Sequence, residues 1–308
     1  MTTKVPTAPT QHSKITRFAA VNIAVAAAVM GIKYIAYLVS GSVALYSDAL
    51  ESIVNVMTAI AALVAVRISS KPADDDHPFG HSKAEFFAAI FEGAMIIIAA
   101  LLILAKVYEA LRFGGTLQQP GLGLTINTAA AVINGAWAYA LIARGKAWRS
   151  PALVADGHHL MTDVVTSVGV IAGLLLVIAT GWQILDALLA GAVALNILWS
   201  GYKIALQSMS SLMDQAASPD IESRIRGVIA ANGDGALQAH DIRTRQAGRV
   251  LFIEFHLVVP GSMTVDDAHA ICDRLENAIE AEIEGSEAVI HVEPDHKAKT
   301  NSEGTVSL

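Results

Sequence analysis

The sequence is poor in cysteine and lacks the motifs of common enzymes. Cys272 is the single cysteine among 308 residues, which excludes an intramolecular disulfide framework and a multi-cysteine zinc finger. Any metal chemistry must therefore rest on histidine, aspartate and glutamate. A phosphate-binding glycine loop of the Walker type is also missing, and no nucleophile stands out beside a general base. We therefore expect no nucleotide partner, no catalytic cofactor and no enzymatic activity.

Charged residues are scarce as well. They make up 16% of the chain, hydrophobic residues make up 54%, and the mean hydropathy is +0.50, which is too apolar for a soluble enzyme of this size. The composition indicates a protein of the lipid bilayer. A formal net charge of −7 argues against nucleic acid as a partner. Residues 1–14 are polar and lack a cleavage-site pattern, so they predict a disordered tail and not a signal peptide.

The apolar segments predict six transmembrane helices, because each is long enough for a helix to cross a hydrocarbon core of roughly 30 Å. The segments fall at about 15–38, 45–69, 84–111, 121–143, 152–179 and 184–206. Lysine and arginine gather before the first span and in the second and fourth connections, whereas the first and fifth connections carry none. The positive-inside rule then puts both termini in the cytoplasm. We expect a multi-pass protein of the plasma (cell inner) membrane, with its six-helix domain over 15–208.

The character of the chain changes after Gln207. The stretch "SPDIESRIRGVIAANG" predicts an amphipathic helix with Ser218 at its N-cap, and "AHDIRTRQ" and "RVLFIEFHLVV" alternate as strands do. A helix over "TVDDAHAICDRLENAIEAEI" and a strand over "EAVIHVE" complete the order αββαβ. This order suggests a small ferredoxin-like α+β sandwich. We place this cytoplasmic domain at 209–295 and a flexible tail at 296–308.

Two of the spans carry the same polar pattern. "DALESIVN" in the second span places Asp48, Glu51 and Asn55 at positions i, i+3 and i+7. "DGHHLMTD" in the fifth span has the same spacing, with Asp156, His159 and Asp163. On a helix these positions share one face. An unpaired acid near the bilayer centre costs about 2.5–3.5 kcal/mol, so several acids in one bundle need compensation.

A divalent cation would supply that compensation, since imidazole, carboxylate and amide oxygen can furnish a four-coordinate shell. The expected ligands are Glu51, Asn55, His159 and Asp163. The alternative is that these groups cap helix ends or hydrogen-bond between helices. Asp48 and Asp156, each one turn nearer the start of its helix, are better explained as N-terminal caps or vestibule groups than as ligands.

The connection "KPADDDHPFGHSKAE" is crowded with acids and histidines between helix-breaking prolines and a glycine. Adjacent acids repel each other unless a cation offsets them. We interpret Asp74, His77 and His81 as a second metal site, and a solvated acidic loop as the alternative.

The C-terminal domain holds a further group of histidines. His240, His256 and His291 fall on expected strands, and Glu293 shares a face with His291 because side chains alternate along a strand. His269 falls in the second expected helix. These five residues form a third candidate metal site, and scattered surface histidines are the alternative.

Taken together, the motifs resemble the cation diffusion facilitator family, most closely its bacterial ferrous-iron and zinc efflux members. The matching pieces span nearly the whole chain and read "SDALESIVN", "PADDDHPFGHSKAE", "ALVADGHHLMTD", "SLMD", "AHDIRTRQAG", "FIEFHL" and "VIHVEP". The resemblance implies a homodimer of six-helix subunits that exports a divalent metal in exchange for protons. It also implies that the first candidate site is the transport site, that the second is a metal site in the loop, and that the third is a regulatory site in the C-terminal domain. Lys83 and Asp214 fall where such proteins form a charge pair that interlocks the dimer at the membrane surface.

One departure from the family pattern concerns the second span. Both transport positions there are usually aspartate in these exporters, whereas this chain has Glu51 and Asn55. An amide cannot be protonated, so Asn55 changes the number of exchangeable protons and the preferred metal. Its oxygen suits Mn²⁺ or Fe²⁺ as readily as Zn²⁺, while His159 favours Zn²⁺, Cd²⁺ or Fe²⁺. We expect a Zn²⁺/proton antiporter that works by alternating access. The alternatives are a membrane-anchored metal sensor without transport and a proton-coupled exporter of organic cations.

Overall fold

The computed structural model describes residues 9–114, 117–147, 151–248, 250–299 and 305–308. The chain divides into two compact units. One consists of residues up to 63 together with 91–205, and the other of 64–90 together with 206–308. The first unit is built from long apolar helices, and the second contains a mixed sheet with a core of its own.

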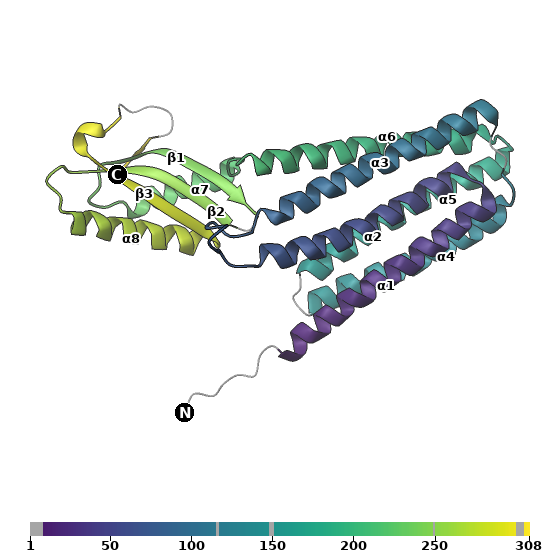
Figure 1. Cartoon of the computed structure of the whole chain (residues 1–308), viewed down its shortest axis with the longest axis horizontal. Helices are drawn as coiled ribbons and strands as arrows, with labels where there is room; N and C mark the ends of the chain where they lie inside the picture. The colour runs from purple at the N-terminus through teal and green to yellow at the C-terminus, as the bar shows by residue number, and fades with distance from the viewer. Residues whose placement is uncertain (1–8, 115–116, 148–150, 249, 300–304) are drawn as a thin grey trace. The chain divides into compact units, whose positions relative to one another are not determined.

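The helical part follows the expected spans. Its helices are α1 (Pro9–Ser40), α2 (Val43–Ser69), α3 (Ala84–Phe113), α4 (Pro120–Ala147), α5 (Pro151–Thr180) and α6 (Ile184–Leu212), as Figure 1 shows. All six are long and apolar enough to cross a membrane, counted over the described residues. The chain is thus a multi-pass membrane protein, as predicted. Residues 9–14, expected in a disordered tail, belong to α1 in the structure, and residues 1–8 lie outside the described residues.

The main apolar core of the first unit lies at one end of the helices. This end, named here the distal end, carries the connections α1–α2, α3–α4 and α5–α6. Leu45, Ile103, Leu174 and Ala190 are buried there and join α2, α3, α5 and α6. Toward the opposite end the described residues form a separate, smaller cluster around Leu141, which packs α4 against α5 with Phe18 of α1 beside it. The bundle is therefore closed by side chains at its distal end and is divided into two groups of helices farther away.

The start of α2 is held by a residue from a distant helix. The carboxylate of Asp186, near the start of α6, accepts hydrogen bonds from the backbone N–H of Val43 at 2.6 Å and from the Ser42 hydroxyl at 2.6 Å. These donors belong to the first turn, where backbone N–H groups have no partner within the helix. Asp186 is buried and fixes the α1–α2 connection to α6.

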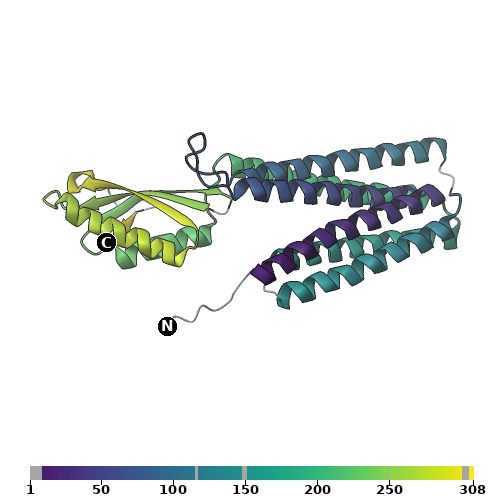
Figure 2. The same ribbon diagram turned by 60° about the horizontal axis from the view of Figure 1, so that its bottom comes forward.

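The C-terminal domain contains α7 (Pro219–Asn232), β1 (Gln238–Ala247), β2 (Val250–Val259), α8 (Val265–Glu282) and β3 (Ser286–Pro294). Its sheet has the order β3-β2-β1-β4, where β4 is the short strand Val306–Ser307, with β2 parallel to β3 and antiparallel to β1. Both helices cover one face of the sheet (Figure 2). Ile229 of α7, Leu275 of α8 and Phe255 of β2 are buried between the layers. The predicted order αββαβ is confirmed.

The ends of these elements agree with local sequence signals, with one addition at the chain end. Ser218 is the N-cap residue of α7, with Pro219 following at the first helical position. Thr264 caps α8, because its side chain accepts a hydrogen bond from the backbone N–H of Asp267. Beyond β3 the chain forms a 3₁₀ turn, η1 (Asp295–Lys297), and a short edge strand, β4 (Val306–Ser307), on β1. The expected flexible tail therefore includes a strand.

Candidate metal sites

The polar stripes of α2 and α5 meet inside the first unit. Asn55 of α2 donates a hydrogen bond from Nδ2 to Oδ2 of Asp163 on α5 at 2.8 Å. Glu51 lies one turn before Asn55, and its charge interacts with that of Asp163. Asp163 is buried, whereas Glu51 and Asn55 are half-buried. Two of the four predicted transport ligands, Asn55 and Asp163, thus contact each other from facing helices, and Glu51 lies one turn away on α2.

His159, the fourth predicted ligand, is exposed. It lies one turn before Asp163 on α5, so the two share a helix face, and its charge interacts with Asp163. Along this face His159 is exposed, whereas Asp163 and Val170, which lie nearer the distal end, are both buried. Among the described residues, Glu51, His159 and Asp163 do not gather three ligand atoms within 4.8 Å of one another. The predicted transport ligands therefore lie where the buried, distal part of the bundle begins. Their ligand atoms are farther apart than they would be around a bound metal ion.

Asp48 does not cap α2, contrary to the expectation from sequence. It is fully inside the helix, and its Oδ1 accepts a hydrogen bond from Nζ of Lys33 on α1 at 2.7 Å. Ser167 on α5 donates to the same oxygen at 2.9 Å, and Asn127 on α4 donates to Oδ2 at 2.9 Å. The sequence analysis missed Lys33, Asn127 and Ser167. The available signal was Lys33, because a lysine inside an apolar span needs a polar or acidic partner there. The side chain of Asp156 lies outside the described residues.

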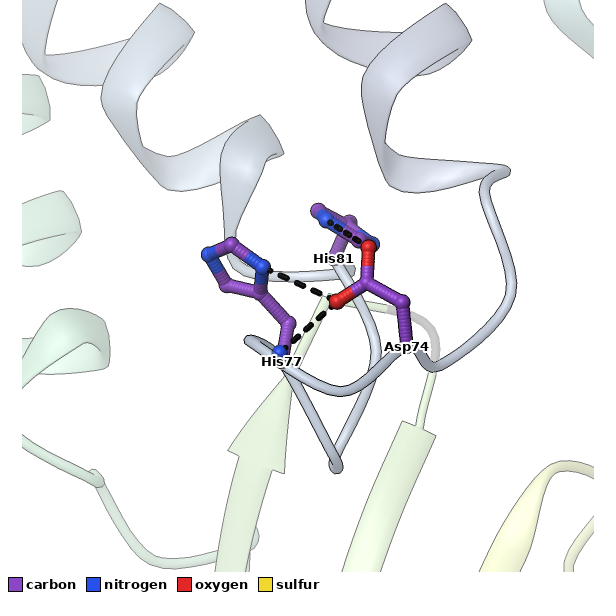
Figure 3. A group of neighbouring side chains, drawn as sticks. All are labelled: Asp74, His77 and His81. Atoms are coloured by element: carbon purple, nitrogen blue, oxygen red, sulfur yellow. Dashed lines mark hydrogen bonds and ion pairs between the residues drawn. The ribbon is translucent and has the colours of Figure 1, made fainter.

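The connection between α2 and α3 brings the predicted loop ligands together. Figure 3 shows the carboxylate of Asp74 facing the rings of both His77 and His81. The distances are 3.2 Å from Asp74 Oδ1 to His77 Nδ1 and 3.5 Å from Asp74 Oδ2 to His81 Nε2. One ligand atom from each residue lies within 4.8 Å of the others. Two imidazoles and a carboxylate are a donor set suited to Zn²⁺ or a similar transition metal.

A tight turn prepares this loop site. The backbone N–H of His77 donates to Asp74 Oδ1 at 2.8 Å, and this hydrogen bond is the main reason that the pKa of Asp74 lies below its usual value. Gly80 has a φ of +77°, which glycine adopts without strain. Phe79 packs edge-on against Phe252 of β2, with ring centroids 5.8 Å apart. The loop is thus fixed against the sheet of the second unit, with an ionised carboxylate at its centre.

The predicted histidines of the sheet form a row across three strands. His240 on β1 pairs with His256 on β2, and His256 pairs with His291 on β3. The ring centroids lie 5.2 Å and 4.9 Å apart along this row. Glu293, two residues after His291, reaches His240 Nε2 at 3.4 Å and His256 Nδ1 at 3.4 Å. The register of the sheet therefore builds a cluster from residues that are far apart in sequence.

The ligand atoms of His240, His256 and Glu293 all lie within 4.8 Å of one another. Burial lowers the pKa of His240, so its ring is neutral at pH 7 and can offer a lone pair to a metal. Asp241, a further oxygen donor that sequence analysis missed, sits at a bulge with a φ of 52°. Its Oδ2 is 4.0 Å from His256 Nδ1 and binds Lys299 Nζ at 2.5 Å. The position of Asp241 directly after His240 in the sequence was the one signal that could have indicated this donor.

His269 does not join this cluster within the chain. It lies on α8, is exposed, and pairs with Asp273 one turn later at 3.6 Å. Within the chain, α8 and the histidine row belong to different layers of the domain, so the assignment of His269 to the same set of ligands as His240 stays a prediction.

Lys83 and Asp214, the predicted charge pair, contact each other in one chain. Lys83 Nζ lies 2.8 Å from Asp214 Oδ1, and Arg245 approaches the same oxygen at 3.8 Å. The hydrogen bond from Lys83 lowers the pKa of Asp214. Asp214 has a φ of 59° just beyond the end of α6, a conformation that aspartate tolerates better than most residues. The pair ties the α2–α3 connection to the segment that follows α6.

Comparisons with known families match both parts of the chain. The model of the cation efflux transmembrane domain matches residues 19–213. The model of the cation efflux protein cytoplasmic domain matches residues 217–295. All candidate ligands described above fall within these two ranges.

Individual relatives extend over nearly the same length. An uncharacterized transporter of Synechocystis sp. is 45% identical over 277 residues, covering 90% of this chain and 89% of the relative. The cation-efflux pump FieF of Shewanella oneidensis is 32% identical over 273 residues, covering 89% of this chain and 92% of the pump. A solved structure of CzrB in its Zn form is 43% identical, covers 28% of this chain and 99% of that chain, and gives a TM-score of 0.27.

Proposed function

The chain belongs to the cation diffusion facilitator family of cation efflux transporters, and on that premise we propose that it exports a divalent transition metal, Zn²⁺ foremost, in exchange for protons. The observation that carries the proposal is the hydrogen bond between Asn55 on α2 and Asp163 on α5. It joins two predicted ligands on separate transmembrane helices. Ionisable groups inside a membrane bundle are costly and characteristic of ion pathways. A bundle that served only as an anchor would have no need of them.

The donor set suits a borderline transition metal. Glu51 and Asp163 offer carboxylate oxygens, His159 offers an imidazole nitrogen, and Asn55 offers an amide oxygen. Imidazole favours Zn²⁺, Cd²⁺ or Fe²⁺ over Mg²⁺ and Ca²⁺, and the amide keeps Mn²⁺ and Fe²⁺ within range. The FieF relative is a cation-efflux pump by name, which agrees with this class of substrate. We therefore rank Zn²⁺ first, with Cd²⁺, Fe²⁺ and Mn²⁺ as further substrates.

Proton exchange follows from competition for the same lone pairs. A metal binds only to the ionised carboxylates and to the neutral imidazole, so binding displaces protons and protonation displaces metal. Asn55 takes no part in this competition, because an amide does not titrate in the accessible range. The exchangeable protons are accordingly those of Glu51, His159 and Asp163.

Access to the site changes sides in this proposal. The site lies at the border of the closed distal part of the bundle, and His159 at its other edge is exposed. A relative tilt of α2 and α5 would tighten or open the shell, which couples occupancy to alternating access. We propose that both termini face the cytoplasm of a cell with this protein in its plasma (inner) membrane. Metal then enters from the cytoplasmic side and leaves at the distal end.

The loop and sheet clusters would serve regulation. Asp74 with its two histidines, and His240 with His256 and Glu293, are already close enough to hold a metal. We propose that the protein acts as a homodimer and that metal bound to the C-terminal domains draws them together. Such binding would shift the transporter toward its competent state when cytoplasmic metal is high. The Lys83–Asp214 pair would stabilise the dimer at the membrane surface.

A reconstitution experiment tests this function against that of a membrane-anchored sensor. The full-length protein is placed in sealed vesicles that contain a pH-sensitive dye, and Zn²⁺, Cd²⁺, Fe²⁺ or Mn²⁺ is added outside. An exporter moves protons in the direction opposite to metal, with Zn²⁺ the most effective. A protein that binds Zn²⁺ with measurable affinity but moves neither metal nor protons would be a sensor, and the proposed function would then be wrong.

A further inference from the structure

Lys33 is buried in the helical bundle, where a lysine is rarely found. Its side chain is 1% exposed, as is that of its partner Asp48. Its Nζ donates to Asp48 Oδ1 at 2.7 Å and to the Ser167 hydroxyl at 2.9 Å. Asn127, which is fully buried, donates to the other oxygen of Asp48. The four residues come from α1, α2, α4 and α5, so a single polar network links four helices.

This network lies one helical turn from the transport site. Asp48 precedes Glu51 by three residues on α2, and Ser167 follows Asp163 by four residues on α5, so both displacements point toward the distal end. Each corresponds to roughly 5 Å along the helix axis. The charges of Lys33 and Asp48 act on Glu51, and they act on Asp163 as well. The network is therefore an electrostatic neighbour of the site, without being one of its ligands.

A buried ion pair is weak evidence for a role in stability alone. Removing two charges from water costs about as much as their attraction returns, and apolar residues of similar volume often replace such pairs without loss. In a lipid bilayer a role in stability alone is even less expected, because each charge has to be removed from water completely, which raises the cost of burying the pair. The location next to two further carboxylates suggests instead that the pair matters through its charge.

We propose that Lys33 is a positioning residue that provides a resident counter-charge and thereby sets the net charge that the transport site presents to its metal. In the ionised form that binds metal, Asp48, Glu51 and Asp163 carry three negative charges, and the ammonium group of Lys33 cancels one of them. The remaining two are balanced by one divalent cation. The inference rests on the proposed function, because it takes Glu51 and Asp163 as the ligands of the transported metal.

The test measures the KM for Zn²⁺ and kcat of transport by the full-length protein in vesicles. Asp48→Asn leaves the ammonium group of Lys33 uncompensated, and we expect the KM for Zn²⁺ to rise about tenfold or more, with a smaller change in kcat. The double variant Lys33→Met with Asp48→Asn removes both charges and keeps the side-chain volume. It should return KM to within about threefold of the wild-type value. Lys106→Met, which removes a partly exposed lysine paired with Glu109 on α3, is the matched control and should leave KM unchanged.

Two results would overturn the inference. One is a wild-type KM for Asp48→Asn in a protein that still elutes as a folded species. The other is a KM in the double variant that remains raised by about tenfold or more, since the net charge at the site is then the same as in the wild type and cannot account for it. If Asp48→Asn alone fails to fold, the double variant still tests the second of these outcomes. An Asp163→Ala protein with normal Zn²⁺ transport would instead contradict the proposed function, so the two failures are distinguishable.

Discussion

Asn55 and Asp163 form a hydrogen bond of 2.8 Å between α2 and α5, across 108 positions of sequence. The bond joins side chains of two different helices, so it reports how those helices pack. It also marks the region in which a metal and protons would compete.

The histidine row of the sheet should bind metal through His256. His256→Ala removes the central ring of the row, and we expect Zn²⁺ affinity at this site of the full-length protein to fall by roughly tenfold or more. Isothermal calorimetry in detergent measures both the affinity and the stoichiometry. His296→Ala, which removes an exposed histidine outside the cluster, is the control and should bind as wild type. An unchanged stoichiometry and affinity in His256→Ala would count against the site.

The loop site should depend on Asp74 and not on its acidic neighbours. Asp74→Asn removes the charge between His77 and His81, so a metal at the loop should bind roughly tenfold more weakly. Asp75→Asn changes the net charge of the loop equally and should have little effect. Zn²⁺ titrations of both variants separate a coordinated metal from one that is attracted by loop charge. Equal losses in the two variants would favour a solvated acidic loop.

The Lys83–Asp214 pair should contribute little to stability at pH 7. Both side chains are more than a third exposed, so Asp214→Asn should lower the free energy of unfolding by about 1 kcal/mol or less. Asparagine also tolerates the positive φ at this position, which keeps the backbone unchanged.

The pH dependence of this contribution has a definite sign. Because the folded pKa of Asp214 is lowered, the stabilisation is present above the unfolded pKa of about 3.9 and is lost as the pH falls through the folded value. Chemical denaturation of wild type and Asp214→Asn at several pH values measures it. A difference that persisted below the folded pKa would show that the carboxylate charge is not its cause.

Asp186 should stabilise the bundle by capping α2. Asp186→Ala removes the acceptor for Val43 N–H and for the Ser42 hydroxyl, and we expect a loss of about 0.5–2 kcal/mol, the usual range for an N-cap. Asp186→Asn keeps one carbonyl acceptor and should lose less. Thermal unfolding in detergent ranks the two variants. If both unfolded at the wild-type temperature, the cap would be without energetic consequence.

Much of this architecture follows from the sequence because it depends on segment length and on periodicity. The six spans are visible as long apolar segments, the order αββαβ is visible as patterns of 3.6 and 2 residues, and the polar stripes of α2 and α5 share one spacing. The period of two also put His291 and Glu293 on one face. What periodicity could not supply was the register of the strands, and that register is what aligns His240, His256 and His291.

The contacts that sequence did not predict have a common physical origin. Asp48, expected from sequence to be a helix cap or a vestibule group, has as its partner Lys33 of α1, which becomes visible only once the helices are packed. The cap of α2 comes from Asp186, which is 143 positions away from Val43. His269, predicted as a ligand together with the other histidines, lies on an exposed face of α8 and apart from them within the chain. Contacts between distant elements decided all three cases.

The most direct test of the account is Zn²⁺-driven proton flux in vesicles that contain Asp163→Ala. Thr162→Ala, an exposed neighbour on α5, serves as the control, and size-exclusion chromatography verifies that both variants fold as wild type does. The account predicts no Zn²⁺-driven proton flux with Asp163→Ala and wild-type flux with Thr162→Ala. Wild-type flux with Asp163→Ala would contradict the claim that a metal and protons alternate at this carboxylate.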